Sequence, residues 1–436
     1  MKDIKISIIC LGCPKNLADM EYLMSKTKKS ILVNEDESEI VVLNTCGFLK
    51  SARDEVFYHI ERLKDKKIIV IGCLSSWFDE KIRKKYPNIF AVLSSANYEK
   101  FEETILEVAN EKRNFLINEE PEIFGEYKGK KLLSSSPFAY IKIAEGCNNK
   151  CGYCLIPYLK GKYRSRKMEE IITEAKDLIK KGIKEIILVA QDCGYYGIDL
   201  YKKKSLSVLL QKLEKIPGDF WIRILYTYPE RVDEELINTI KNSKKICKYM
   251  DIPLQHGDPS TLKSMKRPDN TKKSVKLIET LRKEIPEISI RTSFIVGYPG
   301  ESEKAFLTLK KYIEKLRLNL VGVFEYSREP HTFAYDLDNQ IKSAIKKSRR
   351  NSLMKIQQKI SLENNQKLIG KREKILIEGF DKEQNMYTGR SQRFAPEIDG
   401  IIFIKSAKVL RIGTFINAKI TEANEYDLYA KAISKN

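Results

Sequence analysis

Short apolar runs alternate with amphipathic segments along most of this chain, and this alternation narrows the range of folds more than any other property of the sequence. Apolar runs of this length predict strands, and amphipathic segments predict helices. In the first hundred residues the apolar runs cover residues 4–9, 39–43, 67–71 and 90–93, and a helical pattern covers 52–63. This order favours a small parallel sheet flanked by helices, whose functional groups gather in the loops at the carboxyl ends of the strands.

A second series of strand and helix patterns begins near residue 138. Strand-like runs alternate there with helix-like segments such as residues 168–181 and 272–283. Six βα units are too few for a closed eight-fold barrel and fit a six-stranded partial barrel, which leaves a lateral mouth open for a large substrate. The six strand-like runs are residues 139–144, 185–190, 220–225, 249–254, 288–296 and 320–326.

The remaining segments indicate a linker before this second series and a β module after it. Residues 118–137 are polar and contain glycine, which is typical of a linker. Residues 338–371 are basic and helical in pattern, and the alternation at 374–378 and 400–403 predicts a small all-β module. We therefore predict an α/β chain of three domains, at residues 1–118, 133–365 and 366–436.

Composition excludes several classes of protein. Hydrophobic residues make up 42% of the 436 residues and charged residues 32%, which excludes a disordered or collagen-like chain. No apolar run approaches the roughly 18 residues that cross a bilayer, and the N-terminus lacks the apolar core of a signal peptide, so we expect a cytoplasmic protein without membrane contact. The net charge of +20 favours a polyanionic partner such as RNA or a ribonucleoprotein, although a lysine-rich genome would produce the same excess.

Three of the nine cysteines follow apolar runs of the first domain, and each stands beside a glycine. In a reducing compartment so many cysteines are not structural disulfides, and they suggest metal or cluster ligation. Glycine permits the close backbone approach that a bulky inorganic ligand requires. The three pairs are Cys13 with Gly12, Cys46 with Gly47, and Cys73 with Gly72.

The second domain carries a C-x3-C-x2-C motif, Cys147, Cys151 and Cys154, directly after its first predicted strand. Three thiolates on one tight loop can hold three irons of a 4Fe-4S cluster and leave the fourth iron open. A zinc site usually has a fourth Cys or His close by, and none follows here. The spacing, its position after the first barrel strand, and Tyr153 before the last cysteine resemble the radical S-adenosylmethionine (radical SAM) superfamily.

This resemblance implies a cofactor and a chemistry. In the superfamily the open iron chelates the amino and carboxylate groups of SAM, and the reduced cluster cleaves SAM to methionine and a 5′-deoxyadenosyl radical. Tyr153, Gln191, Asp192 and Gly297 occupy the cluster loop and later strand ends, where cofactor contacts belong. For Gly297 an ordinary turn is an equally good explanation, and for Gln191 and Asp192 the contact could be to substrate instead.

The order of a three-cysteine domain, a radical SAM barrel and a β module resembling the TRAM domain is that of the methylthiotransferases. The resemblance implies that Cys13, Cys46 and Cys73 hold an auxiliary 4Fe-4S cluster that carries sulfide or persulfide sulfur. One SAM methylates this sulfur, and a second SAM supplies the radical that activates the acceptor C–H bond. It also implies an electron donor such as flavodoxin or ferredoxin.

Several motifs are similar to the branch of the family that modifies a ribosomal protein, RimO. That branch adds a methylthio group to the β carbon of an aspartate in a small-subunit ribosomal protein, the decoding-centre protein twelve, either free or within an assembling particle. The alternative is a tRNA adenosine, which the charge favours and the motifs disfavour. The motifs are LGCPKN at residues 11–16, NTCGF at 44–48, KIAEGC at 142–147, GKYRSR at 161–166 and IPLQH at 252–256.

Two residues outside the cysteine sets are candidates for substrate binding. Arg164, in the segment after the cluster loop, either binds a carboxylate or phosphate or supports that loop. His256 follows a predicted strand and either orients substrate or is a hydrogen-bonded structural histidine. Cys10 and Cys247 lack partners and are predicted to be small core residues, whereas Cys193 is expected near the cofactor mouth.

The β module implies a face that binds RNA or protein. Tyr387, Arg390, Arg393 and Phe394 mix charge with aromatic rings, as RNA-binding surfaces do. Plain exposure to solvent explains these four side chains equally well, so we assign no site to them.

Overall fold

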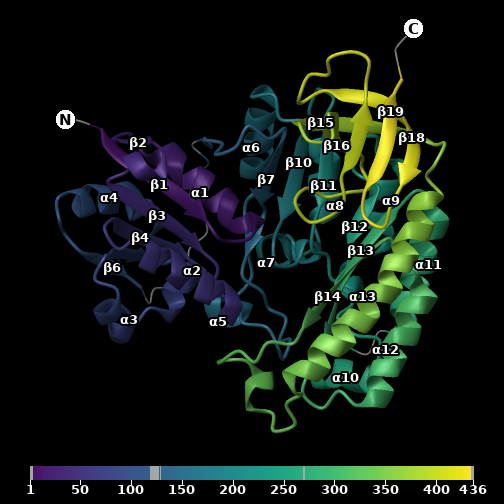
Figure 1. Cartoon of the computed structure of the whole chain (residues 1–436), viewed down its shortest axis with the longest axis horizontal. Helices are drawn as coiled ribbons and strands as arrows, with labels where there is room; N and C mark the ends of the chain where they lie inside the picture. The colour runs from purple at the N-terminus through teal and green to yellow at the C-terminus, as the bar shows by residue number, and fades with distance from the viewer. Residues whose placement is uncertain (1–2, 118–126, 128, 269–270, 434–436) are drawn as a thin grey trace.

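The computed structural model describes residues 3–117, 127, 129–268 and 271–433. It has an N-terminal α/β part, a central partial barrel and a C-terminal β-barrel, which confirms the predicted fold class (Figure 1). Half of the predicted linker, at 118–126 and 128, lies outside the described residues. Within the described ranges, no helix combines the length and the apolar character needed to cross a bilayer.

The N-terminal part is a six-stranded sheet in the order β2-β1-β3-β4-β5-β6, and all of its neighbouring strands are parallel. Helices cover both faces, with one apolar core under α1 and α4 and another under α2. The sequence pattern missed the short edge strands β2 and β6. The elements are β1 (Ile4–Cys10), α1 (Pro14–Lys26), β2 (Ser30–Leu32), β3 (Ile40–Thr45), α2 (Lys50–Arg62), β4 (Lys67–Gly72), α3 (Glu80–Lys85), β5 (Ile89–Leu93), α4 (Phe101–Ala109) and β6 (Asn114–Leu116).

The central part contains the six predicted strands, arranged as two parallel three-stranded sheets. A parallel bridge between Ile222 and Ile246 joins the two sheets into one open arc. The strands are β7 (Phe138–Lys142), β10 (Glu185–Val189), β11 (Trp221–Ile224), β12 (Tyr249–Asp251), β13 (Ser289–Val296) and β14 (Leu320–Glu325), with the short pair β8 (Ala144–Glu145) and β9 (Arg164–Ser165). The helices are α5 (Ile156–Lys160), α6 (Met168–Lys180), α7 (Ile198–Tyr201), α8 (Leu206–Glu214), α9 (Glu234–Asn242), α10 (Pro259–Ser264), α11 (Thr271–Glu284) and α12 (Glu303–Leu316).

A long helix, α13 (Ser343–Gln366), crosses from the barrel to the C-terminal module (Figure 1). The module is a closed five-stranded barrel in the order β15-β16-β17-β19-β18. Alternating residues of these strands fill its interior, as the period-two pattern predicted. Its strands are β15 (Arg372–Asp381), β16 (Met386–Arg390), β17 (Ile402–Lys405), β18 (Phe415–Ala423) and β19 (Leu428–Ala432).

Buried ion pairs join the C-terminal barrel to the central part. Arg390 is 1% exposed and contacts Glu185 of β10 at 2.6 Å, and Glu185 also pairs with Arg223 of β11 at 2.5 Å. Phe394 is also buried. The idea that Arg390 and Phe394 belong to an RNA-binding surface is therefore wrong, because Arg390 is enclosed at the domain interface and Phe394 lies in the apolar core of the C-terminal barrel.

Candidate active site between two sets of cysteines

The first set of cysteines lies at one edge of the N-terminal sheet. Cys13 follows β1, Cys46 follows β3, and Cys73 follows β4. These three strands are neighbours and run parallel, so their carboxyl ends meet at the same edge. Three cysteines that are far apart in the sequence therefore come together.

The glycines beside these cysteines pack tightly against neighbouring segments. A Cβ at Gly47 would lie 2.5 Å from the carbonyl oxygen of Cys73, and a Cβ at Gly72 would lie 2.6 Å from that of Thr45. Gly12 is equally confined by the first turn of α1. The sequence pattern suggested that these glycines admit a ligand, but the contacts of Gly47 and Gly72 show that these two let the cysteine loops approach one another.

A buried asparagine that sequence analysis did not single out ties two of these loops together. Asn16 donates from Nδ2 to Asn44 Oδ1 and to the Thr45 carbonyl, both at 3.1 Å. Its Oδ1 accepts from Cys13 Sγ at 3.1 Å. Two asparagines near cysteines were the signal in the sequence: Asn16 stands three residues after Cys13, and Asn44 stands two residues before Cys46.

Burial favours the neutral thiols in this set. Burial raises the pKa of Cys73 to about 11; Lys160 opposes the shift, and the adjacent Cys13 and Cys46 add to it. Burial also raises the pKa of Cys46. Because cysteine binds iron as the thiolate, metal binding here would release protons from these groups.

The second set lies on the loop that follows β8. The Cys147 N–H donates to the Gly161 carbonyl at 3.1 Å, and Cys151 Sγ lies 3.3 Å from the hydroxyl of Tyr228, just beyond β11. Burial raises the pKa of Cys154 to about 12 and also raises that of Cys147. Contacts on both sides therefore fix this loop at the mouth of the partial barrel.

The two cysteine sets adjoin each other. Leu155, directly after Cys154, packs together with Leu159 and Cys73 in one buried apolar cluster. Among the described residues, no three His, Cys, Asp or Glu side chains converge on a single metal ion. In an iron–sulfur cluster site, each thiolate binds a different iron.

Gln191 and Asp192 lie beside the second set, at the end of β10. Gln191 donates from Nε2 to Glu145 Oε1 at 2.7 Å, while its own Oε1 is buried without a hydrogen-bond partner among the described residues. Asp192 accepts from Asn149 Nδ2, in the cysteine loop, at 3.4 Å. Burial raises the pKa of Asp192, although backbone N–H groups oppose the shift.

Tyr153 lies on the cysteine loop itself, between Cys151 and Cys154, whereas Gly297 lies at the end of another strand. The Tyr153 hydroxyl lies 3.4 Å from Arg267 Nη1. Gly297 directly follows β13 and has a φ of +71°, a conformation that favours glycine. The next residue, Tyr298, directs its hydroxyl at Gly152, where an added Cβ would lie 2.9 Å away.

The two predicted substrate-binding residues, Arg164 and His256, form hydrogen bonds within the protein. Arg164 lies on β9, the strand that pairs with β8. Its guanidinium group donates to the carbonyls of Lys162 and Lys160, at 2.8 and 3.1 Å. His256 is buried, its Nδ1 accepts from the Asp258 N–H at 3.0 Å, and its Nε2 lies 3.6 Å from Glu301. The structure does not place His256 at an exposed surface.

The cysteines outside the two sets have different surroundings. Cys193 and Cys247 are buried, and the prediction of a core position is confirmed for Cys247. The same prediction is wrong for Cys10, which is exposed because it ends β1 at the edge of the sheet where the loops begin.

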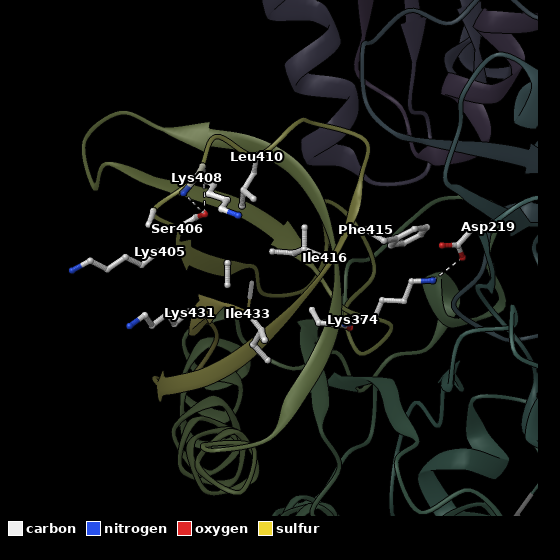
Figure 2. Close-up of a pocket in the computed structure, with 13 residues that line it drawn as sticks. Asp219, Lys374, Lys405, Ser406, Lys408, Leu410, Phe415, Ile416, Lys431 and Ile433 are labelled. Atoms are coloured by element: carbon white, nitrogen blue, oxygen red, sulfur yellow. Dashed lines mark hydrogen bonds and ion pairs between the residues drawn. The ribbon is translucent and has the colours of Figure 1, made fainter. Parts of the chain in front are cut away.

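A separate pocket lies on the C-terminal barrel, with a volume of about 940 Å³. Figure 2 shows lysines from different strands along it, and Lys374 is paired with Asp219 at 2.6 Å. Lys405 and Lys431 are directly opposite in the register of β17 and β19. Like charges in that arrangement repel each other, so an anion in the pocket would be stabilising.

Comparisons with known proteins follow this division of the chain. Residues 5–94 match the Uncharacterized protein family UPF0004, residues 141–313 match the Radical SAM superfamily, and residues 369–433 match the TRAM domain. Among solved structures, the radical SAM methyltransferase TsrM from Kitasatospora setae, with cobalamin and a [4Fe-4S] cluster bound, aligns over 77% of both chains. Its TM-score is 0.57 at 14% identity, which is a likeness of fold.

Full-length relatives are much more similar in sequence. The protein named ribosomal protein uS12 methylthiotransferase RimO from Acetivibrio thermocellus is 42% identical, with 99% of each chain covered. The protein of the same name from Thermoanaerobacter sp. is 44% identical over 97% of this chain and 98% of its own length. Identity of this extent along the entire length shows that this chain belongs to the RimO methylthiotransferase family.

Proposed function

We propose that this chain is a radical SAM methylthiotransferase that adds a methylthio group to the β carbon of an aspartate in ribosomal protein uS12. The observation that carries the proposal is that Cys73 of the first set packs against Leu155, the residue directly after Cys154 of the second set, in a chain whose full-length relatives bear this name. A tRNA adenosine, the alternative substrate, is not favoured by these relatives.

Each cysteine set fits a cluster with one open iron. Cys147, Cys151 and Cys154 would hold the SAM-binding cluster in a core spanning 133–365, and Cys13, Cys46 and Cys73 the auxiliary cluster in a domain spanning 1–118. When bound, these groups supply one-electron cleavage of SAM and the sulfur atom for transfer. The raised thiol pKa values mean that the protein holds protons at these sulfurs until iron displaces them.

Other side chains are proposed to orient SAM beside the second set. Gln191 and Asp192 are suited to the ammonium group of its methionine part, because a buried amide oxygen and a buried carboxylate are both acceptors. Tyr153 and Gly297 are proposed cofactor contacts on the cluster loop and on the strand end that faces it. We also propose that Arg164 and His256 contribute to substrate binding, each by supporting the loop in which it lies.

The experiment that tests the function uses anaerobically reconstituted protein with SAM and a reductant of the flavodoxin or ferredoxin class. Purified uS12 and unmodified tRNA are incubated in parallel with sulfide or a persulfide as the sulfur source. Mass spectrometry should find a methylthio group on an aspartate of uS12 and none on tRNA. Modification of tRNA alone would overturn the proposal.

The cluster count is tested separately. Wild-type protein should contain about eight irons, and a variant with alanine at Cys147, Cys151 and Cys154 should contain about four. About four irons in the wild type, lost in the variant, would mean that the N-terminal cysteines hold no cluster.

The pocket on residues 366–436, the proposed extent of the TRAM module, offers a contact to RNA of a ribosomal particle in the cytoplasm. Its support is the pair of opposed lysines, Lys405 and Lys431, in a chain with a net charge of +20. Reversing both charges to glutamate should weaken binding to rRNA and reduce its salt dependence by roughly one unit of slope per lost phosphate contact. An unchanged salt slope would contradict this assignment.

A further inference from the structure

Lys15 is a cation at the boundary of the two cysteine sets. It is the second residue of α1 and follows Cys13 by two positions. The side chain is half-buried, and Nζ lies 4.7 Å from the centre of the Tyr226 ring, just after β11. Lys15 therefore reaches from the N-terminal domain to the mouth of the barrel.

No carboxylate of the described residues lies within ion-pair distance of this ammonium group. The carboxylates of Glu145 and Asp251 act on it electrostatically from further away, and both are already paired. Glu145 contacts Lys142 at 2.6 Å, and Asp251 contacts Arg291 at 3.2 Å. A partly buried ammonium group without a carboxylate partner can form a charge-assisted hydrogen bond with an arriving carboxylate.

The surroundings of Lys15 connect both cysteine sets. On one side is Cys13, and on the other is Tyr226, two residues before the Tyr228 hydroxyl that contacts Cys151. Tyr226 has a φ of +63°, a strained conformation for a tyrosine, and such strain is concentrated at functional sites. A group that lies between the two sets would therefore meet Lys15.

We propose that Lys15 binds the side-chain carboxylate of the aspartate that is modified. The proposal rests on the proposed function and adds a residue that recognises the substrate. The carboxylate is bonded directly to the β carbon, so anchoring it fixes the reacting carbon between the two sets. An ammonium–carboxylate contact is a charge-assisted hydrogen bond, which discriminates against a neutral amide. A tRNA adenosine has no carboxylate for Lys15 to bind.

The test compares two synthetic peptides that span the target loop of uS12, one with the aspartate and one with asparagine in its place. Binding to cluster-loaded protein with SAM and without reductant is measured by fluorescence anisotropy, so that no turnover contributes. Wild-type protein should prefer the aspartate peptide by roughly tenfold to one-hundredfold. In Lys15→Gln the ratio should fall to near one, and Lys15→Arg should restore part of it.

A matched control lies on the same helix. Lys26, in the last turn of α1, also places its ammonium group over an aromatic ring, that of Tyr22, at 4.4 Å. Lys26→Gln should keep the wild-type ratio, because this end of the helix is far from the cysteines.

Three outcomes would overturn the inference: a wild-type ratio in Lys15→Gln, no preference in the wild type, or a loss of about four irons in Lys15→Gln. The last would make Lys15 a support of the cysteine site. Failure of the proposed function would be distinct, since wild-type protein would then leave the uS12 aspartate unmodified in the mass-spectrometric assay.

Discussion

Gly47→Ala provides a direct test of how the first cysteine set is assembled. An added Cβ would lie 2.5 Å from the Cys73 carbonyl oxygen and 2.7 Å from its carbonyl carbon, and neither atom belongs to a flexible side chain. Reaching an ordinary contact distance of 3.4 Å requires the Cys46 and Cys73 loops to separate by roughly 0.9 Å. Overpacking of this kind costs about 1–3 kcal/mol, and here the displacement falls on two cluster ligands.

The expected result is a protein that has lost only one cluster. After anaerobic reconstitution, the variant should contain about four irons instead of about eight, and it should still form 5′-deoxyadenosine from SAM. Gly370→Ala is the control, because no atom lies within 4 Å of its added Cβ and only its φ of +83° is strained. Full iron content and wild-type methylthiolation in Gly47→Ala would refute the argument that the glycine holds these loops together.

Three further predictions concern the second cysteine set, a buried carboxyl group and the domain interface. Cys151→Ala should abolish 5′-deoxyadenosine formation in a chromatographic assay, and persistent SAM cleavage would contradict the assignment of the cluster ligands. Burial raises the pKa of Asp251 to about 6, with Arg291 partly opposing the shift. Because the folded state holds this proton more tightly than the unfolded state, the contribution of Asp251 to stability is lost as pH rises from about 4 to about 6. The Tm of the cluster-free protein should therefore fall less over that window in Asp251→Asn than in the wild type, and equal slopes would refute the assignment. Lys142→Met leaves Asp19 buried without its close cation and leaves Glu145 with Lys160, at 3.7 Å, as its remaining cation. Urea unfolding should therefore show a loss of about 3–5 kcal/mol, whereas a loss under 1 kcal/mol would show that water reaches these carboxylates.

The sequence predicted the strands and helices of this protein well, because most of its strands are buried and therefore read as apolar runs. It missed β2 and β6, which lie at the sheet edges and have only three residues each, too few to form a recognisable strand pattern. The grouping of Cys13, Cys46 and Cys73 followed from topology, since neighbouring parallel strands end at the same edge.

Side-chain partners across domain boundaries could not be predicted in the same way. Arg390 resembled a surface cation because its partner, Glu185, is 205 residues away in the chain. The partners of Asn16 were similarly unpredictable, because an amide side chain near the start of a helix usually caps that helix or is exposed to solvent. In the sequence, Lys15 was simply one residue of the LGCPKN motif. Its lack of a carboxylate partner becomes evident only when its neighbours in the structure are known.

The interface between the N-terminal domain and the barrel limits how substrate reaches the two cysteine sets. Asp19 of α1 pairs with Lys142 of β7 at 2.6 Å, and Lys130, in the segment between the two parts, contacts both Glu21 of α1 at 3.1 Å and Glu174 of α6 at 3.5 Å. All five of these side chains are buried. Separating the domains would break these pairs, which is costly for buried charges. Opening of the interface is therefore disfavoured, and the separation of the cysteine sets is fixed by packing. We expect the aspartate to enter from the rim, where the half-buried Lys15 lies.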